Sequence, residues 1–102
     1  MLIILTTTPT AEEADLLAEK LVRERLAGCV QILSQMRSVY FWQGEVKKDA
    51  ECLLLIKTIP EQYDKVEACI RNNHSYSVPE IVALKSERVF EGYLDWLKGC
   101  VS

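Results

Sequence analysis

The chain has 102 residues, of which 49% are apolar and 26% are charged, and its formal net charge is −3. This length predicts one domain over residues 1–102, with a single hydrophobic core. The acidic balance argues against a nucleic-acid partner, and no apolar run approaches the roughly 20 residues of a membrane-spanning helix, so we expect neither nucleic acid nor a membrane as a partner.

The first predicted elements are a strand and an amphipathic helix. Leu2–Thr6 is almost wholly apolar and predicts an interior strand. Thr10 and Glu13 have the spacing of a capping box, in which the threonine hydroxyl accepts a helical N–H and the glutamate reaches back. Apolar residues at helical spacing then predict a helix that ends near Gly28: Ala14, Leu17, Ala18, Leu21 and Val22.

The next segment predicts a long β-hairpin. A strand begins at Cys29–Leu33, is interrupted by the polar Ser34–Arg37, where we expect a bulge or break, and continues through the aromatic Ser38–Trp42. Gln43-Gly44 offers the positive φ that a tight turn requires. The returning strand is apolar on consecutive residues over Cys52–Ile56, so it is predicted to be central in a sheet with both faces covered.

A second helix, a loop, a strand and a last helix complete the chain. Thr58 and Glu61 repeat the threonine–glutamate capping pair, and Asn72-Asn73 is a suitable stop for the helix. Residues 74–79 are predicted to form a loop, because proline disfavours helix before it, and Ile81–Leu84 a fourth strand. The last helix leaves Trp96 off its apolar face, which carries Phe90, Tyr93, Leu94 and Leu97.

The order β-α-β-β-α-β followed by a helix is that of the ferredoxin-like fold, in the α+β class. Right-handed crossovers place both main helices on one face of an antiparallel sheet, which leaves the other face bare. A bare face does not suit Cys52–Ile56, which is apolar on both sides. Because several hundred Å² of exposed apolar sheet is uncommon in a monomer, we predict a homo-oligomer whose copies cover this face.

The four cysteines, Cys29, Cys52, Cys69 and Cys100, are widely spaced and form no C-x2-C pair. This pattern favours reduced thiols over a disulfide framework or a zinc site. We therefore expect a cytoplasmic protein that requires no cofactor for folding.

Five short segments occur in a characteristic order and spacing: residues 24–30 (ERLAGCV), 38–45 (SVYFWQGE), 57–58 (KT), 74–81 (HSYSVPEI) and 93–97 (YLDWL). Together they resemble the CutA divalent-cation tolerance family over essentially the whole chain. The resemblance implies a ferredoxin-like subunit in a tight homotrimer, similar in architecture to the PII signalling proteins, with long hairpins that reach neighbouring subunits. It also implies tolerance to copper and other divalent cations, with metal binding.

Two residues depart from the family pattern. Bacterial members associated with copper binding tend to carry cysteine where Thr6 stands here, and a second histidine where Asn73 stands. A metal site built as in those members would keep one soft ligand of three, which is His74.

Three residues are candidate metal ligands. His74 is the only histidine, and a neutral imidazole suits Cu(II) and Zn(II); the alternative is a loop histidine that hydrogen-bonds the backbone. Cys29 offers a thiolate, or is an inert buried thiol at the start of a strand. Glu80 offers a carboxylate for a hard cation, or forms an ion pair at a subunit boundary. One imidazole per subunit is weak for a transition metal unless carboxylates or a neighbouring subunit complete the shell.

A further set of residues is predicted to line a cleft between subunits. Lys57 could hold an anion near the start of the second helix, where free N–H groups point outward, or serve as an ion-pair partner. Four aromatic residues could line the same kind of cleft, which is a usual place for a small ligand, or pack in the interface: Tyr40, Trp42, Tyr76 and Trp96.

Three function hypotheses follow. No sequence motif of a nucleophilic, phosphate-binding, zinc-protease or redox enzyme is present, so we expect no enzyme. The first hypothesis is a cytoplasmic homotrimer that binds a divalent cation of the copper type and serves the response to metal ions. The alternatives are a PII-like module that binds a small molecule, by analogy of fold alone, and a non-catalytic trimeric scaffold.

Overall fold

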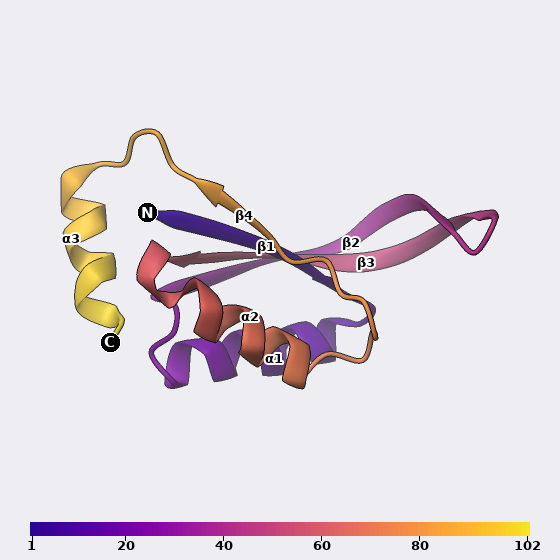
Figure 1. Cartoon of the computed structure of the whole chain (residues 1–102), viewed down its shortest axis with the longest axis horizontal. Helices are drawn as coiled ribbons and strands as arrows, with labels where there is room; N and C mark the ends of the chain where they lie inside the picture. The colour runs from indigo at the N-terminus through magenta and orange to yellow at the C-terminus, as the bar shows by residue number, and fades with distance from the viewer.

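The computed structural model describes residues 1–102 as one four-stranded antiparallel sheet with three α-helices (Figure 1). The strand order is β2-β3-β1-β4, so β3 and β1 are interior, as predicted. The elements are β1 (Leu2–Thr8), α1 (Ala11–Arg23), β2 (Cys29–Trp42), β3 (Glu45–Thr58), a 3-10 turn (Pro60–Gln62), α2 (Tyr63–Asn72), β4 (Val82–Lys85) and α3 (Glu91–Cys100). The α+β prediction, β-α-β-β-α-β with an extra C-terminal helix, is confirmed. None of the helices has the length and hydrophobicity needed to cross a bilayer.

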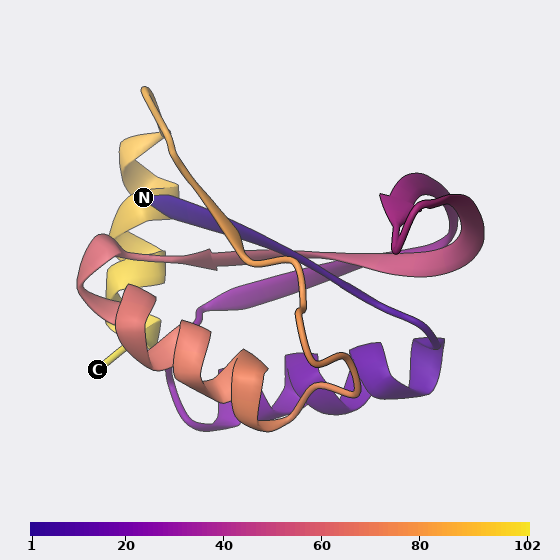
Figure 2. The same ribbon diagram turned by 45° about the vertical axis from the view of Figure 1, so that its right-hand side comes forward.

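Helices α1 and α2 lie side by side against one face of the sheet (Figures 1 and 2). The core lies between these two layers, and its fully buried side chains include Ile4, Leu21, Leu54, Ile56, Val66 and Ile70. The apolar stripe predicted for α1 is confirmed except at Val22, which is 43% exposed because it lies at the edge of the stripe, away from the sheet.

The two predicted helix caps have different outcomes. The Thr10 hydroxyl accepts the Glu13 N–H at 3.1 Å, but the Glu13 carboxylate does not reach back; it accepts a hydrogen bond from the Ser75 hydroxyl at 3.1 Å instead. The prediction that Thr58 and Glu61 cap the second helix is wrong. Thr58 ends β3 with a fully buried side chain, whose hydroxyl donates to the Leu26 carbonyl at 2.6 Å, and the 3-10 turn starts the helix without a side-chain cap.

The sheet face opposite α1 and α2, called the open face below, carries a continuous apolar patch. Residues directly opposite each other in an antiparallel pair share a face, so the strand register defines its members. They are Ile3, Leu5, Leu33, Leu53, Leu55, Val82 and Leu84. Leu33, Val82 and Leu84 are 57%, 45% and 50% exposed, respectively. The sequence predicts that both faces of β3 are covered. Leu53 and Leu55 are only half-buried, so this chain alone does not cover the second face.

The hairpin of β2 and β3 extends well beyond the rest of the sheet (Figure 1). It turns at Gln43 and Gly44, with φ values of 49° and 82°, as the primed turns of two-residue hairpins require. Its aromatic end is largely in solvent, since Phe41 is 71% and Trp42 45% exposed.

The predicted interruption of β2 is a β-bulge between Leu33 and Met36. Two residues there face one residue of β3, and Gln35 has a positive φ of 60°. Because side chains alternate along a strand, the extra residue reverses the alternation beyond it. Tyr40 and Trp42 therefore share the open face with Leu33, although their numbers have the opposite parity.

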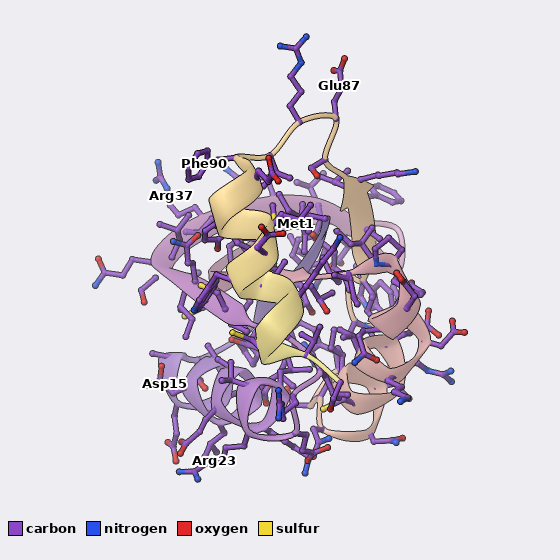
Figure 3. All side chains as sticks on the ribbon, turned by 90° about the vertical axis from the view of Figure 1, so that its left-hand side faces the viewer. Met1, Asp15, Arg23, Arg37, Glu87 and Phe90 are labelled. Atoms are coloured by element: carbon purple, nitrogen blue, oxygen red, sulfur yellow. The ribbon has the colours of Figure 1, made fainter.

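Helix α3 crosses the end of the sheet that lies opposite the hairpin (Figures 1 and 3). Leu97 is its fully buried anchor and packs on Gly28, where a Cβ would lie 2.5 Å from the Leu97 Cδ1. Phe90, predicted on the buried face, is instead 80% exposed just before the first turn (Figure 3). The fourth strand likewise starts one residue later than predicted, at Val82.

Arg25 fastens the end of α3 to the body of the fold. Its guanidinium donates to the Cys100 carbonyl at 3.0 Å and to the Gly99 carbonyl at 2.9 Å, which are among the free carbonyls of the last helical turn. The Gln62 amide, which is buried, adds a bond to the Ser102 carbonyl at 2.5 Å. The C-terminal helix is thus held by hydrogen bonds as well as by Leu97.

We expect Arg25→Ala to loosen α3 selectively. Losing two bonds from a cation to helix carbonyls should cost about 1–2 kcal/mol, mostly as local opening of α3. Amide hydrogen exchange should become faster in α3 and stay unchanged in β1 and β3. Arg23→Ala is the control, because Arg23 pairs only with Glu19 on the exposed side of α1. Equal exchange of α3 in both variants would contradict the assignment.

Candidate functional site

The segment 74–79 connects α2 to β4 and holds the only histidine of the chain. The His74 side chain is fully buried, although its backbone is not. Its Nε2 lies 2.6 Å from the Thr7 carbonyl, at the end of β1, and its Nδ1 accepts the Tyr76 N–H at 3.0 Å. Both ring nitrogens are therefore engaged with backbone groups.

These two bonds assign the protonation state of the ring. A carbonyl accepts only, so Nε2 carries a hydrogen, and an N–H donates only, so Nδ1 does not. The ring is thus the neutral Nε2–H tautomer. The Glu13 carboxylate lies 3.7 Å from Nδ1, which is too far for a hydrogen bond, and with a neutral ring this contact is not an ion pair. His74 acts as a pin that ties the loop to β1.

Tyr76 ties the same loop to β3. Its ring stacks on His74 with centroids 4.9 Å apart, and its hydroxyl donates to the buried Glu51 carboxylate at 2.9 Å. The pairing of β3 with β1 ends at Cys52, so no residue of β1 lies opposite Glu51. Tyr76 takes that place and contacts Glu51. Burial and the bond to Glu51 both raise the pKa of the Tyr76 hydroxyl well above its usual value.

A similar pair lies further along the hairpin. The Tyr40 hydroxyl donates to the Asp49 carboxylate, and this bond is the main reason that the pKa of Tyr40 is raised. Tyr40 is 41% exposed, so it remains available for contacts with another molecule.

The three candidate metal ligands are not brought together within this chain. Cys29 is half-buried at the opposite end of the sheet from His74. It pairs with Lys57, which in turn pairs with Ile3 near the start of β1, whereas His74 bonds Thr7 near the end of β1. Within one chain the Cys29 thiol, expected either as a ligand or as an inert buried thiol, is thus only partly covered. Glu80 is exposed, just before β4.

The donors of one subunit do not fit a copper-type site. Both nitrogens of His74 are used, and no group of three His, Cys, Asp or Glu side chains is close enough to hold a metal ion. Thr6 has a fully buried hydroxyl without a hydrogen-bond partner, on the helix-facing side of β1. A neutral hydroxyl is a poor ligand for copper compared with the thiolate of cysteine. A complete shell would need donors from outside this chain.

A surface groove runs beside the His74 pin without reaching its ring. It has a volume of about 520 Å³ and lies between α1 and the end of α2. Its lining residues are Thr10, Glu12, Glu13, Leu16, Leu17, Lys20 and Asn73. The Glu13 carboxylate is therefore accessible to solvent, whereas the His74 imidazole is fully buried.

The residues predicted to line a cleft lie in two separate places. Tyr40, Trp42 and Tyr76 gather toward the hairpin, whereas Lys57 and Trp96 lie near α3. The prediction that Lys57 faces the start of α2 is wrong. Ile56 and Thr58 are fully buried toward the helices, so Lys57 between them points to the open face, where its Nζ lies 5.6 Å from the centre of the Tyr93 ring.

Sequence reasoning missed two residues of the site, Glu13 and Glu51. The sequence pattern predicts only a helix cap for Glu13 and indicates no role for Glu51. The one signal for Glu51 was an acidic residue directly before an apolar strand. Its partner Tyr76 is 25 positions away, and such a pairing has no local pattern.

The antiparallel β-α-β-β-α-β sheet, with two helices on one face, an overlong hairpin and a loop pinned at the end of β1, defines a ferredoxin-like protein with an open sheet face. Its site contains no nucleophile paired with a base. The chain belongs to the family described as CutA1 divalent ion tolerance protein, which matches residues 2–100. That family is named for tolerance and not for an enzymatic reaction.

Relatives and solved structures agree with this assignment. The Divalent-cation tolerance protein CutA of Thermus thermophilus is 46% identical over 96 residues, covering 94% of this chain and 93% of the relative. That of Archaeoglobus fulgidus is 34% identical over 94 residues, covering 92% and 91%. The solved Cut A1 structure from Thermus thermophilus superposes with a TM-score of 0.96 at 44% identity over the whole of both chains. CutA1 from Oryza sativa gives 0.96 at 39% identity, covering 99% of this chain and 93% of that one.

Proposed function

We propose that this chain serves the tolerance of divalent cations as a cytoplasmic homotrimer, and that it binds a cation of the copper type at the seams between subunits. Membership of the CutA1 family supports the tolerance role. The four unpaired cysteines support a reducing compartment.

The observation that carries the proposal is the uncovered open face. Its apolar patch spans all four strands, and the aromatic end of the hairpin is also exposed. A monomeric protein rarely exposes so much contiguous apolar surface. Copies of the chain that close over this face would bury both features at once.

The seam is the place where a cation shell could be completed. Each subunit presents accessible donors that are too far apart to act together, among them the Cys29 thiol and the Glu80 carboxylate. His74 joins a shell only if its ring gives up the Thr7 carbonyl or the Tyr76 N–H. Cation binding is therefore expected to depend on assembly.

Calorimetric titration of metal-free protein with Cu(II) and Zn(II) tests this dependence. We expect the wild type to bind saturably and Leu55→Glu, which is designed to separate the subunits, to bind at least tenfold more weakly. Leu16→Glu is the matched control, because Leu16 is 64% exposed on the outer side of α1. Equal binding by separated subunits would refute a seam site, and no saturable binding by the wild type would refute cation binding altogether.

A second candidate function is the binding of a small organic molecule, as in a PII-like signalling module. One observation favours it: Lys57 is a half-buried cation with no carboxylate partner. A non-catalytic trimeric scaffold is the remaining alternative, and it would bind neither metal nor small molecule.

A further inference from the structure

Lys57 differs from every other cationic side chain of the molecule. Of the 12 lysines and arginines, only Lys47 and Lys57 are half-buried residues, and Lys47 pairs with Glu45 at 3.0 Å. Lys57 has no carboxylate at ion-pair distance and no hydrogen-bond acceptor; its one polar contact is the face of the Tyr93 ring. Lysine is seldom buried without an ionic partner, and the half-buried Lys57 lacks an anionic partner within its own chain.

The surroundings of Lys57 are aromatic and rigidly placed. Tyr93 packs against Trp96 with ring centres 5.5 Å apart and ring planes tilted by 36°, and Trp96 is 50% exposed. Both rings project from α3, whose position is fixed by the buried Leu97 and by the Arg25 clamp on its last carbonyls. A cation beside a half-exposed aromatic pair is thus built from β3 and α3 of a single chain.

We propose that this corner of Lys57, Tyr93 and Trp96 binds a small organic anion with a flat apolar body, such as an aromatic carboxylate. The ammonium group binds the carboxylate, and the exposed Trp96 ring stacks on the flat body. A carboxylate from a second subunit would also neutralise Lys57, but it would leave Trp96 without a role. The inference rests on the second candidate function and is independent of cation binding.

Three probes separate the charge from the ring: benzoate has both, benzamide has the ring without the charge, and acetate has the charge without the ring. Trp42→Phe leaves Trp96 as the only tryptophan, so its fluorescence reports this corner. We expect benzoate to give a saturable change, with benzamide and acetate binding at least tenfold more weakly. In the same background, Lys57→Gln should weaken benzoate at least tenfold, and Lys65→Gln, at an exposed lysine of α2, should not.

Several results would overturn the inference. They are the absence of saturable benzoate binding, equal affinity for benzoate and benzamide or for benzoate and acetate, and an unchanged benzoate affinity in Lys57→Gln. Sedimentation velocity of the same variants adds a check on the alternative partner. If Lys57→Gln dissociates the assembly while benzoate fails to bind the parent protein, the partner of Lys57 is a carboxylate of another subunit and the anion site does not exist. Because no metal is added, failure here leaves the cation proposal untouched.

Discussion

Replacing Leu55 with glutamate is expected to convert the proposed assembly into single chains at micromolar concentration. Leu55 lies in the centre of the open face, between Gln31 and Leu5 in register, and is half-buried even within one chain. In an assembly that covers this face, an unpaired carboxylate would be buried at every copy. Such a burial costs several kcal/mol per subunit, enough to shift the association equilibrium by orders of magnitude.

Sedimentation velocity and light scattering measure this outcome directly. Leu16→Glu introduces the same charge on the outer side of α1 and should leave the assembly intact. Circular dichroism should show that both variants retain helices and strands, since neither residue belongs to the helix-facing core. A Leu55→Glu protein that stays assembled would show that the open face is not the interface, and the seam sites proposed above would lose their basis.

Replacing His74 with alanine should destabilise the metal-free protein by about 2–4 kcal/mol. The change removes a fully buried ring and leaves the Thr7 carbonyl and the Tyr76 N–H without partners. Each unpaired buried group costs about 1–3 kcal/mol, and the lost packing adds to it. Denaturant unfolding in the presence of a chelator, at one fixed protein concentration, measures the loss.

His74→Asn is the matched variant for this prediction. An asparagine carbonyl can take the place of Nδ1 as acceptor for the Tyr76 N–H but cannot reach Thr7, so it should restore part of the stability. Unchanged stability of metal-free His74→Ala would contradict the structural role. If His74→Ala is less stable without metal, a weaker metal affinity of this variant does not show that His74 is a ligand. The substitution would also have removed the hydrogen bonds that hold the loop in place.

The element order could be predicted from the sequence because each element carries its own local signal. The turn at Gly44, the polar interruption before Met36 and the consecutive apolar residues of β3 each act within a few positions. The failures have a common cause in tertiary contacts. Thr58 has the right spacing for a cap, but the end of a central strand directs its hydroxyl to Leu26, which is 32 positions away.

The candidate site was predicted less completely than the fold, for the same reason. Loop placement and the uniqueness of His74 are visible in the sequence, and the alternative of a backbone-bonded histidine matches the structure. What the sequence does not show is which groups surround the ring. Thr7, Tyr76 and Glu13 come from three separate elements, and only the packing of α1 against the sheet brings them together.

Because of the β-bulge in β2, the number of residues between Leu33 and Met36 decides which side chains beyond it lie on each face of the hairpin. Deleting Gln35 would restore regular pairing and rotate the distal half of the strand by one position, so that Val39 and Phe41 would exchange sides with Tyr40 and Trp42. The other residues of the strand would all be retained, yet the two faces of the hairpin would carry different side chains. Insertions and deletions in this short segment should therefore be tolerated far less than substitutions at the same positions.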